Sequence, residues 1–186
     1  YDDDSTATFN DNSSSNMAEI TNLPGLFIQD EIKITNSKTL LLGIRYDHNS
    51  IHGSILTPRF NYKITNQDKS SVFRFSIGSG YRIAKVFTED HAALTGAREV
   101  VFLNDLKPER SWNTNINYVK NIYAKQGYIL DFDTSVFWTK FSNKIVPNYD
   151  TNPNLILYDN LKDKSITKGA SINFNSLFNN GLRINM

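Results

Sequence analysis

Residues 73–82 read FRFSIGSGYR, and this stretch decides the fold. Large apolar side chains stand at every second position from Phe73 to Ile77 and return at Tyr81, while Arg, Ser and Gly fill the positions between them. Because successive side chains of a β-strand point to opposite faces, this alternation predicts a strand with one apolar face and one polar face.

The same alternation recurs along most of the chain, which predicts an all-β protein. Seven stretches carry it, and an eighth begins at Leu182, where the pattern is still running as the sequence ends. A pattern that stops in this way leads us to expect a piece of a longer protein. The seven predicted strands lie at residues 26–34, 40–46, 56–64, 73–82, 112–118, 128–138 and 170–175.

The connections between the predicted strands alternate in length. Barrels of the bacterial outer membrane show this alternation, because their periplasmic turns are short and their extracellular loops are long. We therefore predict an antiparallel up-and-down transmembrane β-barrel, with residues 1–22 in an extracellular loop and residues 23–186 in the barrel wall. The short connections fall at residues 35–38, 65–70, 124–127 and 179–181, and the longer ones at residues 47–54, 83–110 and 145–167.

The composition excludes several other classes of protein. The 186 residues include no cysteine, which removes disulfide scaffolds, thiolate zinc sites and thiol catalysis. The net charge of +1 argues against a nucleic-acid partner, which normally requires a basic excess. The sequence contains no GxSxG, P-loop or HExxH motif, so we expect neither an enzyme nor a bound cofactor.

The two faces of the predicted strands differ in a way that suits a wide barrel. Aromatic residues at both ends of the strands and aliphatic residues between them match the interfaces and core of a bilayer, although aromatic residues are also good strand formers in general. The polar face is rich in Asn, Gly and Ser, which suits a lumen that holds water or another polypeptide. The aromatic residues are Tyr46, Tyr81, Trp112 and Trp138 at the loop ends, and Tyr62, Phe73, Tyr118 and Tyr128 at the turn ends.

Two motifs resemble a known family. Residues 75–82, FSIGSGYR, followed by residues 106–111, LKPERS, resemble the signature of TonB-dependent outer-membrane receptors. The block at residues 87–99, FTEDHAALTGARE, is similar to a subset of these receptors that is common in Bacteroidetes. One departure is the pair Ile83-Ala84, where the family usually places Pro after the Arg. Supporting pieces in the family's order are FIQDE at 27–31, GIRYD at 43–47 and PR at 58–59.

The resemblance covers residues 23–186 and implies a function. It implies a barrel of about 22 strands with a separate plug in its lumen, of which this chain supplies roughly a third. The whole receptor would bind a scarce ligand, such as a ferric siderophore, haem, cobalamin or a glycan, and import it with energy from TonB. The implied partners are the lipid bilayer of the outer membrane and the TonB complex, which acts through the plug region.

Two other classes of protein remain open from the sequence. The first is a self-contained small outer-membrane barrel with a structural or adhesive role, in which eight strands close. The second is a soluble β-sandwich that serves as a binding module or an enzyme, with a dry core between two sheets.

Candidate ligand contacts lie on the predicted extracellular side. Imidazole beside carboxylate suits zinc, copper or iron, so His48, His52 and His91 are also candidate metal ligands. The alternatives are that wet loops collect His and Asp without function, and that the charged residues of the long loop pair with each other. The full set of ligand-contact candidates is His48, His52, Glu89, Asp90, His91 and Arg98.

Two carboxylates share the polar face of one predicted strand. Asp131 and Asp133 lie two residues apart, a spacing that invites comparison with the paired carboxylates of a glycosidase. On a strand that lines a lumen, we expect them instead to pair with neighbouring Lys or Arg side chains.

Overall fold

The computed structural model describes residues 2–3, 19–84, 86, 98–124 and 128–186. Eight strands form one antiparallel sheet in the order β13-β12-β9-β8-β6-β5-β4-β3, so each strand pairs with the nearest sheet strand along the sequence. This arrangement confirms the predicted up-and-down topology. The eight strands are β3 (Gly25–Thr35), β4 (Lys38–Asn49), β5 (Gly53–Thr65), β6 (Ser71–Arg82), β8 (Glu109–Tyr123), β9 (Ile129–Ser142), β12 (Ser165–Leu177) and β13 (Arg183–Asn185).

The long strands are sufficient to cross a bilayer. Strand β3 has 11 residues and β8 has 15, whereas a tilted transmembrane strand needs about 9–11. No helix among the described residues is long and apolar enough to span a membrane.

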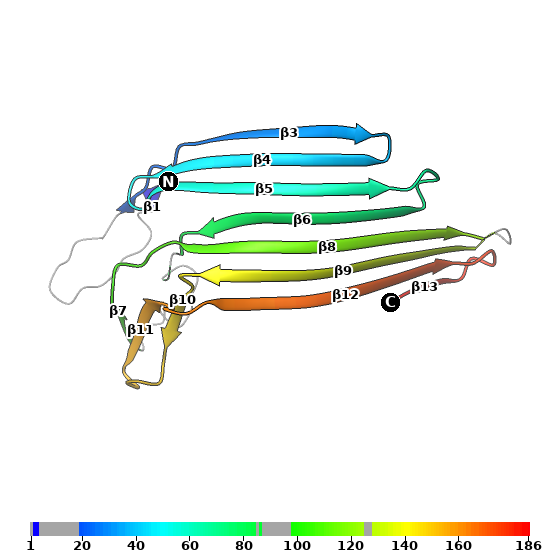
Figure 1. The fold of residues 1–186 in the computed structure, drawn as a ribbon. Helices are drawn as coiled ribbons and strands as arrows, with labels where there is room; N and C mark the ends of the chain where they lie inside the picture. Colours follow the sequence, from blue (N-terminus) through cyan, green and yellow to red (C-terminus); the bar gives the residue numbers. More distant parts are fainter. Residues whose placement is uncertain (1, 4–18, 85, 87–97, 125–127) are drawn as a thin grey trace.

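The short turns and the long connections gather at opposite ends of the sheet. In Figure 1, strands β3, β5, β8 and β12 end at the right, where the short turns follow them in the sequence, and β6 and β9 end at the left, where the long connections begin. The predicted sorting is therefore confirmed for the connections that follow β6 and β9, whereas the β4–β5 connection at the same end is short. We call the left end the loop end and the right end the turn end.

One predicted connection is shorter than expected. We predicted a loose segment at residues 47–54, but β4 continues to Asn49 and β5 begins at Gly53. The side-chain oxygen of Asn49 accepts the backbone N–H groups of Ile51 and His52 at 2.8 Å each, and Gly53 has a φ of 74°. These local features close a tight hairpin that the alternation of apolar residues does not reveal.

The long connections contain strands that the sequence pattern did not predict. Three short strands form a second sheet at the loop end, in the order β10-β11-β7, with β11 antiparallel to β10 and parallel to β7. We had assigned residues 83–110 and 145–167 as loops, because runs of four to six residues are too short to show a clear alternation. The three strands are β7 (Glu99–Phe102), β10 (Ile145–Asn148) and β11 (Leu155–Asn160).

The apolar side chains of the large sheet form an exposed surface. Their register places them side by side across strands, as Phe75, Ile116 and Val136 show. Ile116 is 43% exposed and Val136 is 51% exposed. The buried hydrophobic residues of the described chain are Ile55, Val86, Ile156 and Tyr158, and none of them lies among the alternating apolar positions of the large sheet.

The opposite face carries a polar network that differs from our expectation. Arg74 donates to the side-chain oxygen of Asn117 at 2.8 Å, and the amide nitrogen of Asn117 donates to Asp133 at 2.6 Å. The partner of Asp133 is thus an amide rather than Lys or Arg. The reason is the register. Asn117 lies on β8, directly opposite Arg74 on β6, and β8 also pairs with β9, which carries Asp133.

The sheet is open in the described part of the chain. Strands β3 and β13 each pair with one neighbour and do not pair with each other, so the eight strands do not close into a small barrel. Residues 1–22 are described only in part. Within them, β1 (Asp2–Asp3) pairs antiparallel with β2 (Glu19–Ile20).

Candidate ligand-binding loops

The described ligand-contact candidates lie at the loop end of the sheet. His48 is exposed near the end of β4, and His52 is half-buried in the hairpin that follows. Arg98 directly precedes β7 in the small sheet. Glu89, Asp90 and His91 lie outside the described residues.

The predicted metal ligands remain a prediction. In the ranges that the structure describes, no group of three or more His, Cys, Asp or Glu side chains could hold a metal ion. The predicted set includes His91, which is not described, so His48 and His52 supply only two of its three members.

Arg98 contacts a residue from the other long connection. Its guanidinium carbon lies 5.9 Å from the centroid of the Tyr149 ring, and its Nη1 donates to the Tyr149 carbonyl oxygen at 3.5 Å. A guanidinium over an aromatic ring is a favourable cation–π arrangement. The pair presents a cation beside an aromatic surface at the loop end.

The small sheet has its own apolar core, which positions these side chains. Val86, Ile156 and Tyr158 are buried together, and Val100, Leu106 and Ile145 pack against them. The rings of Phe102 and Tyr158 lie 5.9 Å apart.

Glu109 connects the small sheet to the large one. The residue is 6% exposed, and its carboxylate accepts the Arg82 guanidinium at 2.8 Å and the backbone N–H of Ile145 at 2.8 Å. It therefore joins the end of β6, the start of β8 and the start of β10. The LKPERS motif contains Glu109, but the sequence pattern does not indicate this role for the residue.

Asn160 makes a second connection between the two long segments. Its side-chain oxygen accepts the N–H of Lys107 at 2.7 Å, and its amide nitrogen donates to the carbonyls of Lys107 at 2.9 Å and Asn143 at 2.6 Å. Asp159 accepts the side-chain amide of Asn104 nearby, at 3.1 Å for the shorter of two contacts. The sequence holds no signal for these partners, since they lie about 50 residues away from Asn104 and Lys107.

An ion pair between the exposed Arg45 side chain and the buried Asp47 carboxylate supports the β4–β5 hairpin. The Arg45 guanidinium donates to both carboxylate oxygens of Asp47, at 2.8 Å and 3.0 Å, and Asp47 is fully buried. The backbone N–H of His48 donates to the carbonyl of Pro24 at 2.9 Å. These contacts hold the backbone that carries His48 and leave its side chain exposed.

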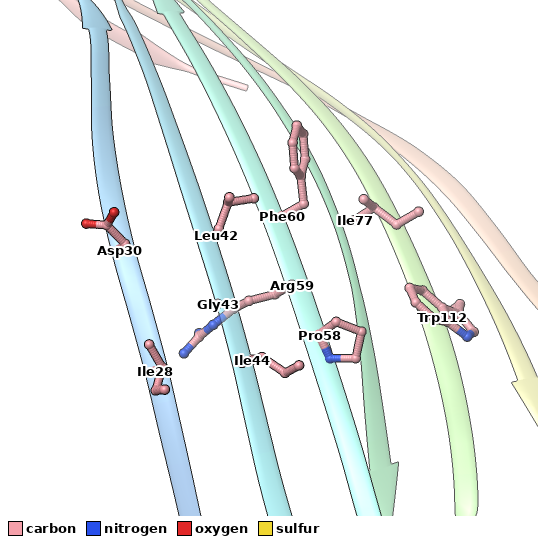
Figure 2. A pocket seen from close by; sticks show the side chains of 10 residues that line it. All are labelled: Ile28, Asp30, Leu42, Gly43, Ile44, Pro58, Arg59, Phe60, Ile77 and Trp112. Carbon is pink, nitrogen blue, oxygen red and sulfur yellow. The ribbon is translucent and has the colours of Figure 1, made fainter.

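A separate hollow of about 410 Å³ lies along strands β3, β4, β5, β6 and β8 (Figure 2). Most of its lining side chains belong to the apolar face, which offers little to orient a charged ligand. We therefore place the candidate ligand site at the loop end rather than in this hollow. The lining residues are Ile28, Asp30, Leu42, Gly43, Ile44, Pro58, Arg59, Phe60, Ile77 and Trp112.

The described side chains at the loop end offer groups for non-covalent binding. These groups are an exposed imidazole at His48, the half-buried His52, and the guanidinium of Arg98 over Tyr149. Such groups suit an anionic or aromatic ligand.

Comparison with known proteins gives matches over most of the chain. A family model described as "TonB dependent receptor-like, beta-barrel" matches residues 1–185. The iron-regulated outer membrane virulence protein of Vibrio cholerae serotype O1 is 29% identical over 121 residues, which is 64% of this chain and 18% of that protein. The same protein from a second V. cholerae strain is 28% identical over an equal span.

Solved structures share the fold. The siderophore receptor PirA of Pseudomonas aeruginosa has a TM-score of 0.65 at 19% identity, covering 87% of this chain and 29% of that one. The hemophore receptor HasR of Serratia marcescens, solved with its hemophore HasA and heme, has a TM-score of 0.66 at 16% identity. That match covers 84% of this chain and 32% of HasR.

Proposed function

Because the chain belongs to the TonB-dependent receptor-like β-barrel family, we propose that it forms part of the barrel wall of a receptor that imports an iron-type ligand. The family is one of outer-membrane receptors and transporters rather than enzymes, and the chain is located in the outer membrane of a Gram-negative bacterium.

One observation carries the proposal. The eight-stranded sheet exposes its large apolar side chains and collects its long connections at one end. In water such a surface would be an aggregation hazard, whereas in a bilayer it faces hydrocarbon. The long connections then face the outside of the cell, where a ligand arrives.

The size of the relatives supports a larger barrel. The chain spans 18% of the length of the curated relatives that it matches and 29% of PirA. We propose that further strands pair with β3 and β13, because an unpaired strand edge in lipid leaves backbone groups without hydrogen bonds. We also propose residues 1–22 as part of an extracellular loop, and a separate plug that contacts TonB.

The names of similar proteins narrow the ligand class. The V. cholerae relative is named as iron-regulated, PirA is a siderophore receptor, and HasR was solved with heme. We therefore propose a ferric siderophore as the ligand, with haem as the second candidate. We keep cobalamin as a third class because the wider family resemblance includes it.

The proposed ligand contacts are the side chains at the loop end. His48, His52 and Arg98 are candidates with described positions, and His48 and His52 are also proposed metal contacts. From the sequence alone we add Glu89, Asp90 and His91, the last of them also as a metal contact. The similarity of residues 87–99 to the Bacteroidetes subset supports a proposal that the chain belongs to that subset.

Uptake by the full-length protein tests the proposal. Iron-starved cells that lack their own iron receptors would express it, with and without TonB, and receive ferric enterobactin, haem or cobalamin. We expect uptake of an iron compound only in cells that contain TonB. Uptake of none of the three, or uptake that persists without TonB, would contradict the proposal.

Substitution of the candidate residues tests the site. We expect the combined change of His48, His52 and His91 to Ala to weaken binding of the transported probe in purified protein, and Arg98→Ala to do so as well. Asp105→Ala is a matched control, since Asp105 is exposed in the same long connection as Arg98 and makes no side-chain bond in the described structure. Unchanged binding in both candidate variants would remove these residues from the site.

A further inference from the structure

We infer that the two long connections act as one ligand-facing unit, which Glu109 and Asn160 hold at the rim of the sheet as positioning residues. The unit consists of residues 98–108 and 143–164. That the two segments fold as one unit follows from the contacts described below, and only the role of the unit toward a ligand rests on the proposed function.

The apolar core belongs to both connections. Val100 and Leu106 come from the first connection, whereas Ile145, Ile156 and Tyr158 come from the second. Separation of the two segments would expose buried Ile156 and Tyr158 to water, which is unfavourable in proportion to the apolar area exposed.

The backbone of each connection completes the backbone hydrogen bonds of the other. Strand β7 pairs in parallel with β11, and the N–H of Glu99 donates to the carbonyl of Asn154 at 2.9 Å. At the other end of the pair, the N–H of Leu103 donates to the carbonyl of Tyr158 at 3.1 Å. Parallel strands cannot be joined by a tight hairpin, so this pairing forms only when the two connections come together.

Polar side chains fasten the unit where it leaves the sheet. Asn160 pairs with both backbone groups of Lys107 in the first connection and also donates to the carbonyl of Asn143 in the second. The Glu109 carboxylate ties the first residue of β10 to the ends of β6 and β8. Because Glu109 is buried, these donors replace water in stabilising its negative charge.

This assembly explains how the proposed contact pair arises. Arg98 belongs to the first connection and Tyr149 to the second, so their contact exists only while the two segments are joined. A motion of the unit moves both side chains together.

Hydrogen exchange in the ligand-free, full-length protein tests the unit directly. In Glu109→Ala, we expect the amides of residues 98–108 and 143–164 to exchange faster by the same factor. That factor should be about tenfold, because the variant loses hydrogen bonds to a charged group, one of which comes from the partly exposed Arg82. The matched control is Asp105→Ala, which we expect to leave exchange in both segments unchanged. Faster exchange in only one segment of Glu109→Ala would overturn the inference.

A cross-link between the connections provides a second test. Val101 and Leu157 are register partners on the face of the small sheet opposite its core, and the chain has no cysteine to compete. In Val101→Cys/Leu157→Cys, we expect a disulfide to form and the Kd for ferric enterobactin or haem to be unchanged on oxidation. Binding that oxidation abolishes and a reductant restores would overturn the inference.

The two tests separate this inference from the proposed function. If the parent protein binds no iron compound, the proposed function fails, but the exchange measurement still decides whether the two segments form one unit. If it binds an iron compound and the two segments exchange independently, the proposed function stands and the unit does not.

Discussion

At the scale of single residues, close backbone packing and polar contacts at the two ends of the large sheet stabilise its hairpins and turns. Asp47 is fully buried and is held by Arg45 at the loop end, while Asp68 accepts hydrogen bonds in the turn between β5 and β6. Neither role follows from residue type, since both residues are aspartates in polar stretches.

Gly25 is expected to be required for the Asp47 site. A Cβ at this position would overlap the Asp47 carboxylate, which its burial and the Arg45 guanidinium keep from moving away. We expect Gly25→Ala to lower the free energy of unfolding by about 1–3 kcal/mol, as overpacking typically does. Denaturant titration of the full-length protein in lipid or detergent measures the change.

Gly80 provides the comparison for this substitution. A Cβ at Gly80 would meet its nearest neighbour, the Ser111 hydroxyl oxygen, at an ordinary 3.4 Å. Gly80→Ala should therefore leave stability nearly unchanged. Equal effects of the two substitutions would show that Gly25 has no special role.

Asp68 is expected to make the stability of its turn depend on pH. The backbone N–H and then the hydroxyl of Ser70 donate to its carboxylate, at 2.9 Å and 3.1 Å, and these bonds lower the pKa of Asp68 below its ordinary value of 3.8. A lowered pKa contributes stability above pH 3.8 that is lost as the pH falls through the folded value.

Asp68→Asn measures that contribution. We expect this variant to show a smaller difference between unfolding at neutral pH and unfolding below pH 3.8 than the parent protein does. Asp163→Asn is the control, because Asp163 is exposed and its carboxylate makes no bond among the described residues. If the pH dependence is the same in Asp68→Asn and the parent, the contribution is absent.

At the scale of strands, the alternation of side chains was predictable and the polar partners across strands were not. All seven predicted strands and the start of the eighth are present, because their period of two extends over many residues. Strands β7, β10 and β11 were missed because they are short and are stabilised by each other.

Asn117 is expected to stabilise the packing of three strands. Its side chain bridges Arg74 on β6 and Asp133 on β9, and it also donates to the Ser135 hydroxyl at 2.9 Å. We expect Asn117→Ala to cost about 1–2 kcal/mol in the free energy of unfolding, since each such bond contributes about 1 kcal/mol net. Urea titration of the full-length protein gives this value.

Asn115 is the matched position for that experiment. It lies two residues away on the same face of β8, and its side chain makes no hydrogen bond in the part of the chain that is described. Asn115→Ala should cost much less than Asn117→Ala, and an equal cost would contradict a bridging role.

At the scale of the whole molecule, the main expectation is that the apolar face of the large sheet contacts lipid. Ile116 and Asn115 are neighbours at the middle of β8 and point to opposite faces. We expect Ile116→Arg to destabilise the full-length protein in lipid vesicles by about 2–4 kcal/mol, the usual cost of Arg at the midplane of a barrel wall.

The opposite face provides the control for this prediction. Asn115→Arg places the same charge on the polar face and is expected to cost much less. Denaturant unfolding in vesicles compares the two variants, and a cost for Ile116→Arg no larger than that for Asn115→Arg would show that the apolar face does not contact lipid.

The candidate site was predictable only in its location. The order of short and long connections predicted that His48, His52 and Arg98 share one end of the sheet, and the bounds of β4, β5 and β7 place them there. Their contact with a ligand stays a prediction. The contact of Arg98 with Tyr149 joins residues 51 positions apart, so no local pattern could indicate it.

The sequence by itself determined the strands, their order and the split between an apolar and a polar face, because each depends on local alternation and on the lengths of the connections. Only the tertiary structure decided that the two long connections fold together and that Glu109, Asn160 and Asn117 join distant segments. Those contacts depend on strand register and on backbone partners far along the chain, which residue type alone does not specify.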